Sequence, residues 1–317
     1  MLTASEGFPV IVDCHTHIWE SPDQLGKARV EALRLAPKGP AAEPDAAAGP
    51  DASMEHHQRA GQPVDRCLVL GFKSRHLGAE IPAPFVAAYV RRQPEKLIGV
   101  AGIDPTNLGE ALGDIRRARE EFGFPAITVS PAAQDFHPAD SRAMQVFGEA
   151  MRLKMPVLLH QGFRACTGSK MEFARPALLD EVAREFPELN LVIAHMGYPW
   201  VEECVVLLGK HENVFADISG LLRRPWQAYN ALLSAYQYGV IDKLLFGSDF
   251  PYSAPATAIE ALYRINQLVT GTNLPTIPRP HLAGIVDRDT LGLLGIEPAA
   301  APARSRDEAD MLDANER

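Results

Sequence analysis

Short apolar segments recur along the chain, each followed by a helical pattern, and this recurrence limits the folds that the chain can adopt. The segments are continuous apolar runs, which are typical of strands covered on both faces in a parallel sheet. We predict eight of them, repeating at roughly 30 residues, as expected for strand–helix units. The predicted strands span 9–17, 66–72, 97–103, 126–129, 156–160, 191–195, 214–218 and 243–247.

Eight strand–helix units favour a closed (β/α)8 TIM barrel over an open doubly wound sheet. No GxGxxG pattern of a dinucleotide-binding sheet follows the first strand. Histidines recur instead at several strand ends, where a barrel has its active site. We therefore expect an α/β barrel as a single domain over 1–296. Its helices are predicted at 54–61, 85–93, 108–122, 141–153, 176–186, 201–210, 226–238 and 256–269, with one or two short helices at 281–295.

Two segments depart from this pattern. Residues 20–51 form a long insertion in the first strand–helix connection, and its Pro- and Ala-rich part, PKGPAAEPDAAAGPD, cannot bury enough apolar area to order itself. The insertion leaves from the strand that carries two histidines, so a lid over the site and a plain surface loop both stay open. Residues 297–317 are rich in Ala, Pro and charge, and we predict a disordered tail.

Composition narrows the classes of partner. The formal net charge of −9 argues against nucleic acid and acidic membrane surfaces, because binding to phosphates needs a basic face. No run approaches the ~18 apolar residues of a membrane helix, and the first residues lack the pattern of a signal peptide. Four cysteines without CxxC spacing favour free thiols in a reducing compartment. We expect a cytoplasmic protein with a small-molecule substrate, and leave a homodimer open.

Five reactive side chains stand at the ends of four predicted strands. His15 and His17 end the first strand, His160 the fifth and His195 the sixth, and Asp249 lies just past the eighth. In a barrel these ends meet on one face, so the five side chains should converge. Three neutral imidazoles and a carboxylate suit one divalent ion, zinc first, with manganese, iron or cobalt as alternatives. The remaining imidazole suits proton transfer.

Regular alternation along the first strand, PVIVDCHTH, predicts which side chains share a face. Asp13, His15 and His17 would point to one side, and Val12, Cys14 and Thr16 to the other. Asp13 would then be a partner of a ligand imidazole, or form a hydrogen bond at a helix terminus or in the barrel core.

Four motifs in order, VDCHTH, LLHQG, VIAHMG and FGSDFP, resemble the amidohydrolase superfamily. More narrowly, they resemble the amidohydrolase-related branch that includes aminocarboxymuconate-semialdehyde decarboxylase. The resemblance implies a barrel of the metal-dependent hydrolase type with a single metal. It implies His15, His17, His160 and Asp249 as ligands, and His195 as the histidine that activates a metal-bound water. The fourth strand, AITVSP, lacks the bridging lysine of two-metal members, which agrees with one metal.

The ligand set is common to several reactions. A hydrolase would attack a carbonyl with the activated water, and Asp249 would relay a proton to the leaving group. A non-oxidative decarboxylase is the alternative on the same site, and a hydratase is a third variant. A metal-free lactonase or a non-catalytic binding protein would keep the scaffold, although the presence of all five site residues weighs against a non-catalytic protein.

The resemblance also bears on the substrate. Carboxylates and phenols are frequent substrates in this branch, and a carboxylate calls for a cation. Arg164 and Arg223 follow the fifth and seventh strands, and the guanidinium fork suits a carboxylate. Trp19 follows the first strand and is the candidate for an aromatic pocket wall.

Overall fold

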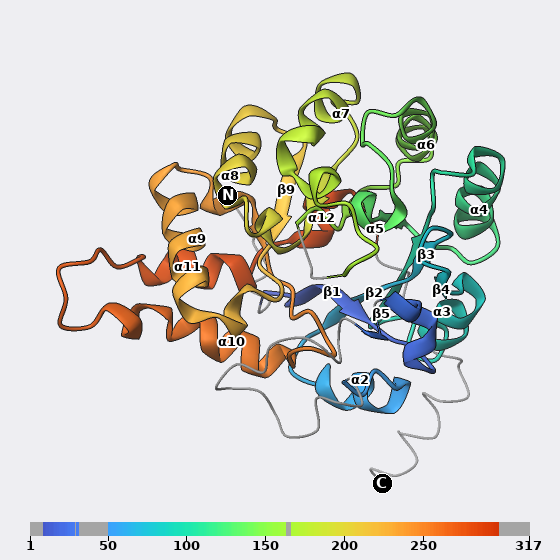
Figure 1. Cartoon of the computed structure of the whole chain (residues 1–317). Coiled ribbons are helices and arrows are strands. Elements are labelled where there is room, and N and C mark those ends of the chain that lie inside the picture. The colour runs from blue at the N-terminus through green and yellow to red at the C-terminus, as the bar shows by residue number, and fades with distance from the viewer. Residues whose placement is uncertain (1–8, 29, 32–49, 163–165, 298–317) are drawn as a thin grey trace, which may run out of the picture.

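The chain forms one closed parallel barrel with helices around it (Figure 1). The structure is a computed structural model that describes residues 9–28, 30–31, 50–162 and 166–297. Its main sheet has eight strands in the order β1-β2-β5-β6-β7-β8-β9-β10. They are β1 (Val12–His17), β2 (Arg66–Leu70), β5 (Leu97–Gly102), β6 (Ala126–Val129), β7 (Val157–Leu159), β8 (Leu191–Ile193), β9 (Val214–Asp217) and β10 (Leu244–Leu245). All eight predicted strands and the predicted fold class are confirmed.

The sheet closes where β1 meets the segment that follows β10. Cys14 N–H donates to the Phe246 carbonyl at 3.0 Å, and His17 N–H donates to the Phe250 carbonyl at 2.9 Å. In the reverse direction, Asp249 N–H donates to the His15 carbonyl at 3.0 Å. This closure brings the histidines of β1 beside the FGSDFP motif, although more than 200 residues separate them along the chain.

Helices cover the outside of the barrel. The longer helices turn an apolar stripe toward the strands, as in α6, where the buried Ala143, Val146, Phe147 and Ala150 recur every three or four residues. The helices are α2 (Met54–Ala60), α3 (Ala83–Val90), α4 (Leu108–Glu120), α5 (Pro131–Gln134), α6 (Ser141–Arg152), α7 (Asp180–Glu185), α8 (Val201–Lys210), α9 (Pro225–Gln237), α10 (Pro255–Tyr263), α11 (Arg279–Val286) and α12 (Thr290–Leu294).

The barrel interior is filled by its own apolar cluster. One side chain or more from every strand contributes to it, and α12 adds Leu291 and Leu294. Asn190, just before β8, donates to the Leu293 carbonyl at 3.0 Å, so α12 lies at the amino ends of the strands. The carboxyl ends, where the histidines stand, are therefore the open end of the barrel.

Strand β1 does not alternate regularly, so the face prediction for its residues is wrong in part. Its pairing with β2 shifts register between Asp13 and Thr16. Val12 and Cys14, predicted to face away from the histidines, pack in the inner cluster of the barrel beneath them. Such an irregularity is a bulge, which re-aims the side chains that follow it.

Two elements were not predicted. Strands β3 (Phe72–Ser74) and β4 (Ala79–Ile81) form an antiparallel hairpin between β2 and α3. The insertion also begins with an ordered turn, η1 (Pro22–Leu25), capped by Ser21. Most of the insertion and all of the tail except Glu297 lie outside the described residues, so the disorder predicted for them, and the lid, stay predictions.

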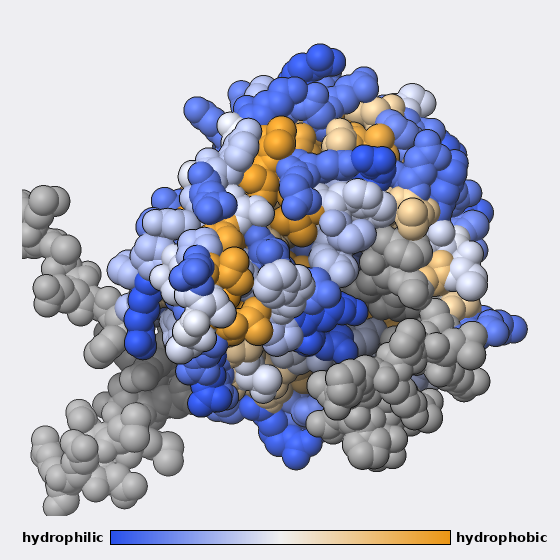
Figure 2. All heavy atoms as spheres, turned by 60° about the vertical axis from the view of Figure 1, so that its left-hand side comes forward, coloured by the Kyte–Doolittle hydropathy of each residue, from blue (hydrophilic) through white to orange (hydrophobic). Residues whose placement is uncertain are grey.

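Among the described residues, no helix is both long and apolar enough to span a membrane. The face in Figure 2 is mainly hydrophilic, with hydrophobic side chains in a broken band. Large apolar side chains exposed in the described part of the chain include Trp226, Tyr238 and Tyr263.

Candidate active site

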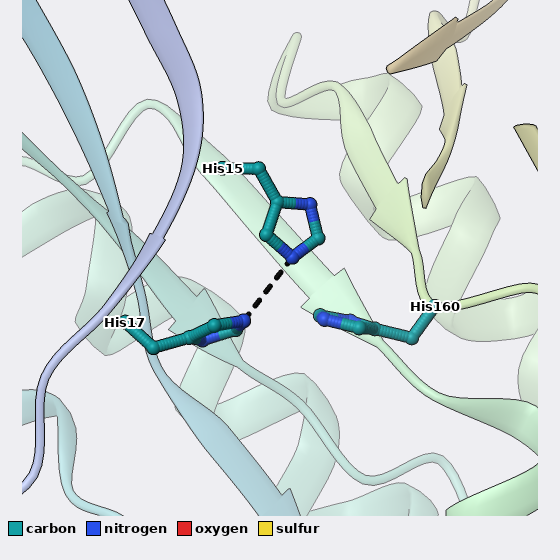
Figure 3. Close-up of side chains that lie close together, drawn as sticks. All are labelled: His15, His17 and His160. Atoms are coloured by element: carbon teal, nitrogen blue, oxygen red, sulfur yellow. Dashed lines mark hydrogen bonds between the residues drawn. The ribbon is translucent and has the colours of Figure 1, made fainter. Parts of the chain in front are cut away.

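Three histidines converge at the open end of the barrel. His15 and His17 lie at the end of β1, and His160 directly follows β7. Their rings point toward one another (Figure 3), with His15 Nε2 3.1 Å from His17 Nε2. The ring centroid of His160 lies 4.8 Å from that of His15 and 5.4 Å from that of His17. One ring nitrogen of each histidine lies within 4.8 Å of the others.

Asp249 and His195 complete the group from tight turns after β10 and β8. Asp249 has φ 66° and His195 φ 57°, both in the left-handed region, where Asp and His occur more often than most residues. Asp249 Oδ1 lies 4.0 Å from His15 Nε2. The His195 ring centroid lies 4.8 Å from that of His15. The structure therefore brings all five predicted residues together.

The chemistry of the donor set, three imidazoles and one carboxylate, suits one divalent ion. Two ligand atoms that share an ion at about 2.1 Å each are separated by at most about 4.2 Å. The 3.1 Å between His15 and His17 and the 4.0 Å between His15 and Asp249 satisfy this limit. His15 and Asp249 are buried, and buried carboxylates and imidazoles this close are stabilised by a shared cation. His160 is oriented by Thr128 at the end of β6, whose Oγ1 lies 3.3 Å from His160 Nδ1.

Asp217 is a site residue that the sequence reasoning missed. It ends β9, is fully buried, and its Oδ2 lies 2.8 Å from His15 Nδ1. Its Oδ1 accepts the N–H groups of His195 and Ser219, both at 3.0 Å, and the Ser219 hydroxyl. Burial alone would raise the pKa of Asp217, but His15, His195 and Ser219 hold it well below its usual range. The signal was an acid inside an apolar run, VFADI, at a fifth strand end.

Asp13 binds backbone groups and not a ligand imidazole. Its Oδ1 accepts the Ser248 N–H at 2.9 Å and the His15 N–H at 3.2 Å. Its Oδ2 is buried without a hydrogen-bond partner among the described residues. Burial raises the pKa of Asp13 to about 6, against the lowering effect of these hydrogen bonds. Asp13 thus fastens β1 to the segment that carries Asp249.

A mainly apolar pocket opens onto the histidines. His17, His160 and His195 line it, together with aromatic, aliphatic and small side chains from the β3–β4 hairpin and several strand ends. Trp19 belongs to this lining as predicted, and so does Leu25 from the start of the insertion. The remaining lining residues are Phe72, Leu77, Ile81, Ser130, Ala132, Ala133, Gly162, Cys166, Ser169 and Tyr252.

Only one of the two predicted arginines falls within the described residues. Arg223 is not among the lining residues, but its guanidinium lies 5.7 Å from the ring centroid of Tyr252, which does line the pocket. Arg164 falls outside the described residues. Within the described part of the chain, no lysine or arginine lines the pocket.

The family model for amidohydrolases matches residues 12–273, which span β1 to the segment after α10 and include all five convergent residues. The chain belongs to the amidohydrolase family. The resemblance drawn from the four motifs is thereby confirmed. Among curated proteins, no sequence matches the chain.

Solved structures with the same fold cover nearly the whole chain. An uncharacterised TIM-barrel protein from Bordetella bronchiseptica is 18% identical, with a TM-score of 0.66 and coverage of 90% of this chain and 99% of its own. A dihydroxybenzoic acid decarboxylase from Polaromonas sp. JS666, with bound manganese and the inhibitor 2-nitroresorcinol, is 14% identical, with a TM-score of 0.63. The match covers 91% of this chain and 97% of the decarboxylase. A probable 2-pyrone-4,6-dicarboxylic acid hydrolase from Acinetobacter baumannii, with bound citric acid, is 15% identical, with a TM-score of 0.60. The match covers 90% of this chain and 99% of the hydrolase. At these identities the likeness concerns the fold.

Proposed function

We propose that the protein is a mononuclear metal-dependent hydrolase that acts on a small, largely apolar or aromatic substrate. The observation that carries this proposal is the convergence of three imidazoles and one carboxylate beside a further histidine, at the bottom of an apolar pocket. We assign His15, His17, His160 and Asp249 as the ligands of one divalent ion. Zinc suits this nitrogen-rich set, and manganese, iron and cobalt remain alternatives.

The protein's own groups have separate roles in this proposal. When bound, the metal supplies a Lewis acid that lowers the pKa of water and polarises a carbonyl oxygen. His195 lines the pocket beside the ligands and takes the proton from the attacking water. Asp249, whose side chain lies close to His195 across Gly220, receives this proton from His195 and relays it to the leaving group.

The pocket indicates the kind of substrate. The described lining encloses about 100 Å³, the same order as the ~150 Å³ apolar cavity that accepts benzene, and we therefore propose that the part of the substrate held beside the metal is no larger than about one ring. The ring centroids of Trp19 and Tyr252 lie 6.3 Å apart, and both side chains line the pocket. Trp19 is the residue that we assign as the aromatic wall against which the substrate packs. For a substrate carboxylate, Arg164 and Arg223 remain the proposed cations.

Non-oxidative decarboxylation is the second candidate. The mainly apolar lining offers few groups that would hold water at the reacting carbon, and such a surrounding favours loss of carbon dioxide over hydrolysis. Decarboxylases of dihydroxybenzoate and of 5-carboxyvanillate are among the proteins with this fold. A metal-free lactonase and a non-catalytic protein stay open only if the site binds no metal.

A substrate panel separates the two reactions. We would assay the metal-loaded protein against aromatic carboxylic acids, lactones and esters, following carbon dioxide release and acid release in parallel. Acid release from lactones or esters supports the hydrolase, and carbon dioxide release supports the decarboxylase. His195→Asn should remove the limb of the pH–rate profile that reports the base and lower kcat by about 100-fold or more. An unchanged profile would take His195 out of proton transfer.

Three further points belong to the same proposal. Residues 1–296 form one domain, and the protein is located in the cytoplasm. The oligomer that we consider is a homodimer. Limited proteolysis, fractionation of cells and light scattering would test them in turn.

A further inference from the structure

Asp217 contacts two proposed site histidines through different oxygens. Its Oδ2 lies 2.8 Å from His15 Nδ1. Its Oδ1 accepts the backbone N–H of His195 and both the N–H and the hydroxyl of Ser219. A carboxylate only accepts hydrogen bonds, so every group that contacts it must donate. This requirement fixes protons that the heavy atoms alone do not show.

For His15 the consequence is direct. The nitrogen that faces Asp217, Nδ1, must carry the proton, so in the neutral ring Nε2 is unprotonated. Nε2 is the atom that lies 3.1 Å from His17 Nε2 and 4.0 Å from Asp249 Oδ1. The nitrogen directed into the site is therefore the one with a lone pair for a metal.

For His195 the argument runs through Ser219. The single hydroxyl proton of Ser219 is given to Asp217, so toward His195 Nδ1, at 2.7 Å, its oxygen only accepts. The Ser219 carbonyl, 2.8 Å from the same nitrogen, also only accepts. Nδ1 of His195 must therefore carry the proton, and Nε2 is unprotonated on a ring that lines the pocket.

We propose that Asp217 is the positioning residue that sets the tautomers of both His15 and His195, so that one ring presents a metal-binding nitrogen and the other a base. This proposal deepens the proposed function and rests on it for the roles of the two rings. The tautomers themselves require no metal.

Asp217→Asn should reverse the tautomer of His15 and leave that of His195 unchanged. Three donors surround the position of Oδ1, so the amide oxygen of the substituted side chain takes that position and its NH2 group faces His15 Nδ1. His15 must then hold its proton on Nε2, the nitrogen directed into the site. His195 keeps its proton on Nδ1, because Ser219 still donates to an oxygen.

The test is nitrogen NMR of metal-free protein with isotope-labelled histidines at pH 8. The signals of His15 and His195 are assigned from variants in which one histidine at a time is replaced. We expect both rings with the proton on Nδ1 in the wild type. In Asp217→Asn we expect His15 with the proton on Nε2, and an affinity for Zn²⁺ lower by about 10- to 100-fold in chelator competition. Asp180→Asn is the matched control, since Asp180 also pairs with a histidine, His211, at 2.7 Å on the outer helices. It should leave both readouts unchanged.

A wild-type His15 or His195 protonated on Nε2 would overturn the proposal, whatever the variants do. So would an Asp217→Asn protein that binds Zn²⁺ as tightly as the wild type. If the wild type has the expected tautomers but binds no divalent ion, the proposed function fails and the role of Asp217 in setting the tautomers stands.

Discussion

Gly220 separates Asp249 from His195, and its missing side chain makes room for both. A Cβ there would lie 2.9 Å from Asp249 Oδ2 and 3.4 Å from His195 Nδ1. The residue has φ +69°, so Gly220→Ala also strains the backbone. We expect Gly220→Ala to displace Asp249, to weaken metal binding by about 10-fold or more, and to lower kcat/KM at least as much. Metal titration and steady-state kinetics measure both effects.

Gly239→Ala is the control for the strain alone. Gly239 has φ +78°, and a Cβ added there would meet no described atom within 4 Å, so the methyl group contacts no site residue. Both variants should lose about 1 kcal/mol of unfolding free energy. Equal activity losses in the two variants would mean that backbone strain, and not contact with Asp249, explains the effect.

The sequence predicted the five convergent residues because a strand end is a place that pattern alone can locate. It did not predict Asp217 or Gly220 as site residues. Their importance lies in contacts between strands and turns, such as the bond from Asp217 to His15 across 202 residues. Whether a strand-end acid faces the site depends on register, which one chain's pattern does not reveal.

At the scale of elements, His57 joins α2 to the barrel below the site. The Thr16 hydroxyl donates to the Leu68 carbonyl at 2.7 Å, so His57 Nε2 donates to Thr16 Oγ1 at 2.9 Å. His57 Nδ1 then accepts from the Tyr89 hydroxyl at 2.8 Å. Burial, followed by Lys96 and His56, lowers the pKa of His57 to about 4 from its usual value near 6.5. The hydrogen bonds of His57 are therefore structural.

The lowered pKa predicts a pH-dependent stability. His57 takes up a proton near pH 6.5 in the unfolded chain, but only near pH 4 in the folded protein. This contribution to the free energy of unfolding is therefore complete above pH 6.5 and falls by about 3 kcal/mol as the pH drops to 4. Urea unfolding of wild type and His57→Gln at pH 7.5 and 4.5 measures it. Asp13 titrates in both proteins, so its contribution cancels in the comparison. If wild type and His57→Gln lost the same unfolding free energy between pH 7.5 and 4.5, the assignment to His57 would be contradicted.

The elements themselves followed from apolar runs, and the exceptions have physical causes. The eight barrel strands are buried on both faces, which makes their sequences continuous and easy to locate. The β3–β4 hairpin is short and partly exposed, with Lys73 and Glu80 opposite each other, so no apolar run marks it. The bulge in β1 was not predictable, because it arises where the strand pairs with β2 on one side and closes the barrel on the other.

At the scale of the whole molecule, closure of the barrel assembles the site. Strands β1, β7, β8 and β10 each supply one edge of it, and the apolar inner cluster and α12 fill the barrel beneath. The family, the fold and the direction in which the site opens could be predicted from order and spacing. The substrate could not, because the pocket is built from the hairpin, the start of the insertion and loops whose mutual placement no motif encodes.

The central claim is a single divalent ion held by His15, His17, His160 and Asp249. Crystals of protein prepared with Zn²⁺ and measured at the zinc absorption edge test it most directly. The account predicts one anomalous peak per chain, at about 2.0 to 2.2 Å from one nitrogen of each histidine and one oxygen of Asp249. It also predicts loss of the peak in His15→Ala. No peak there in the wild type, or a peak among His15, His195 and Asp217, the other group that could hold an ion, would contradict the account.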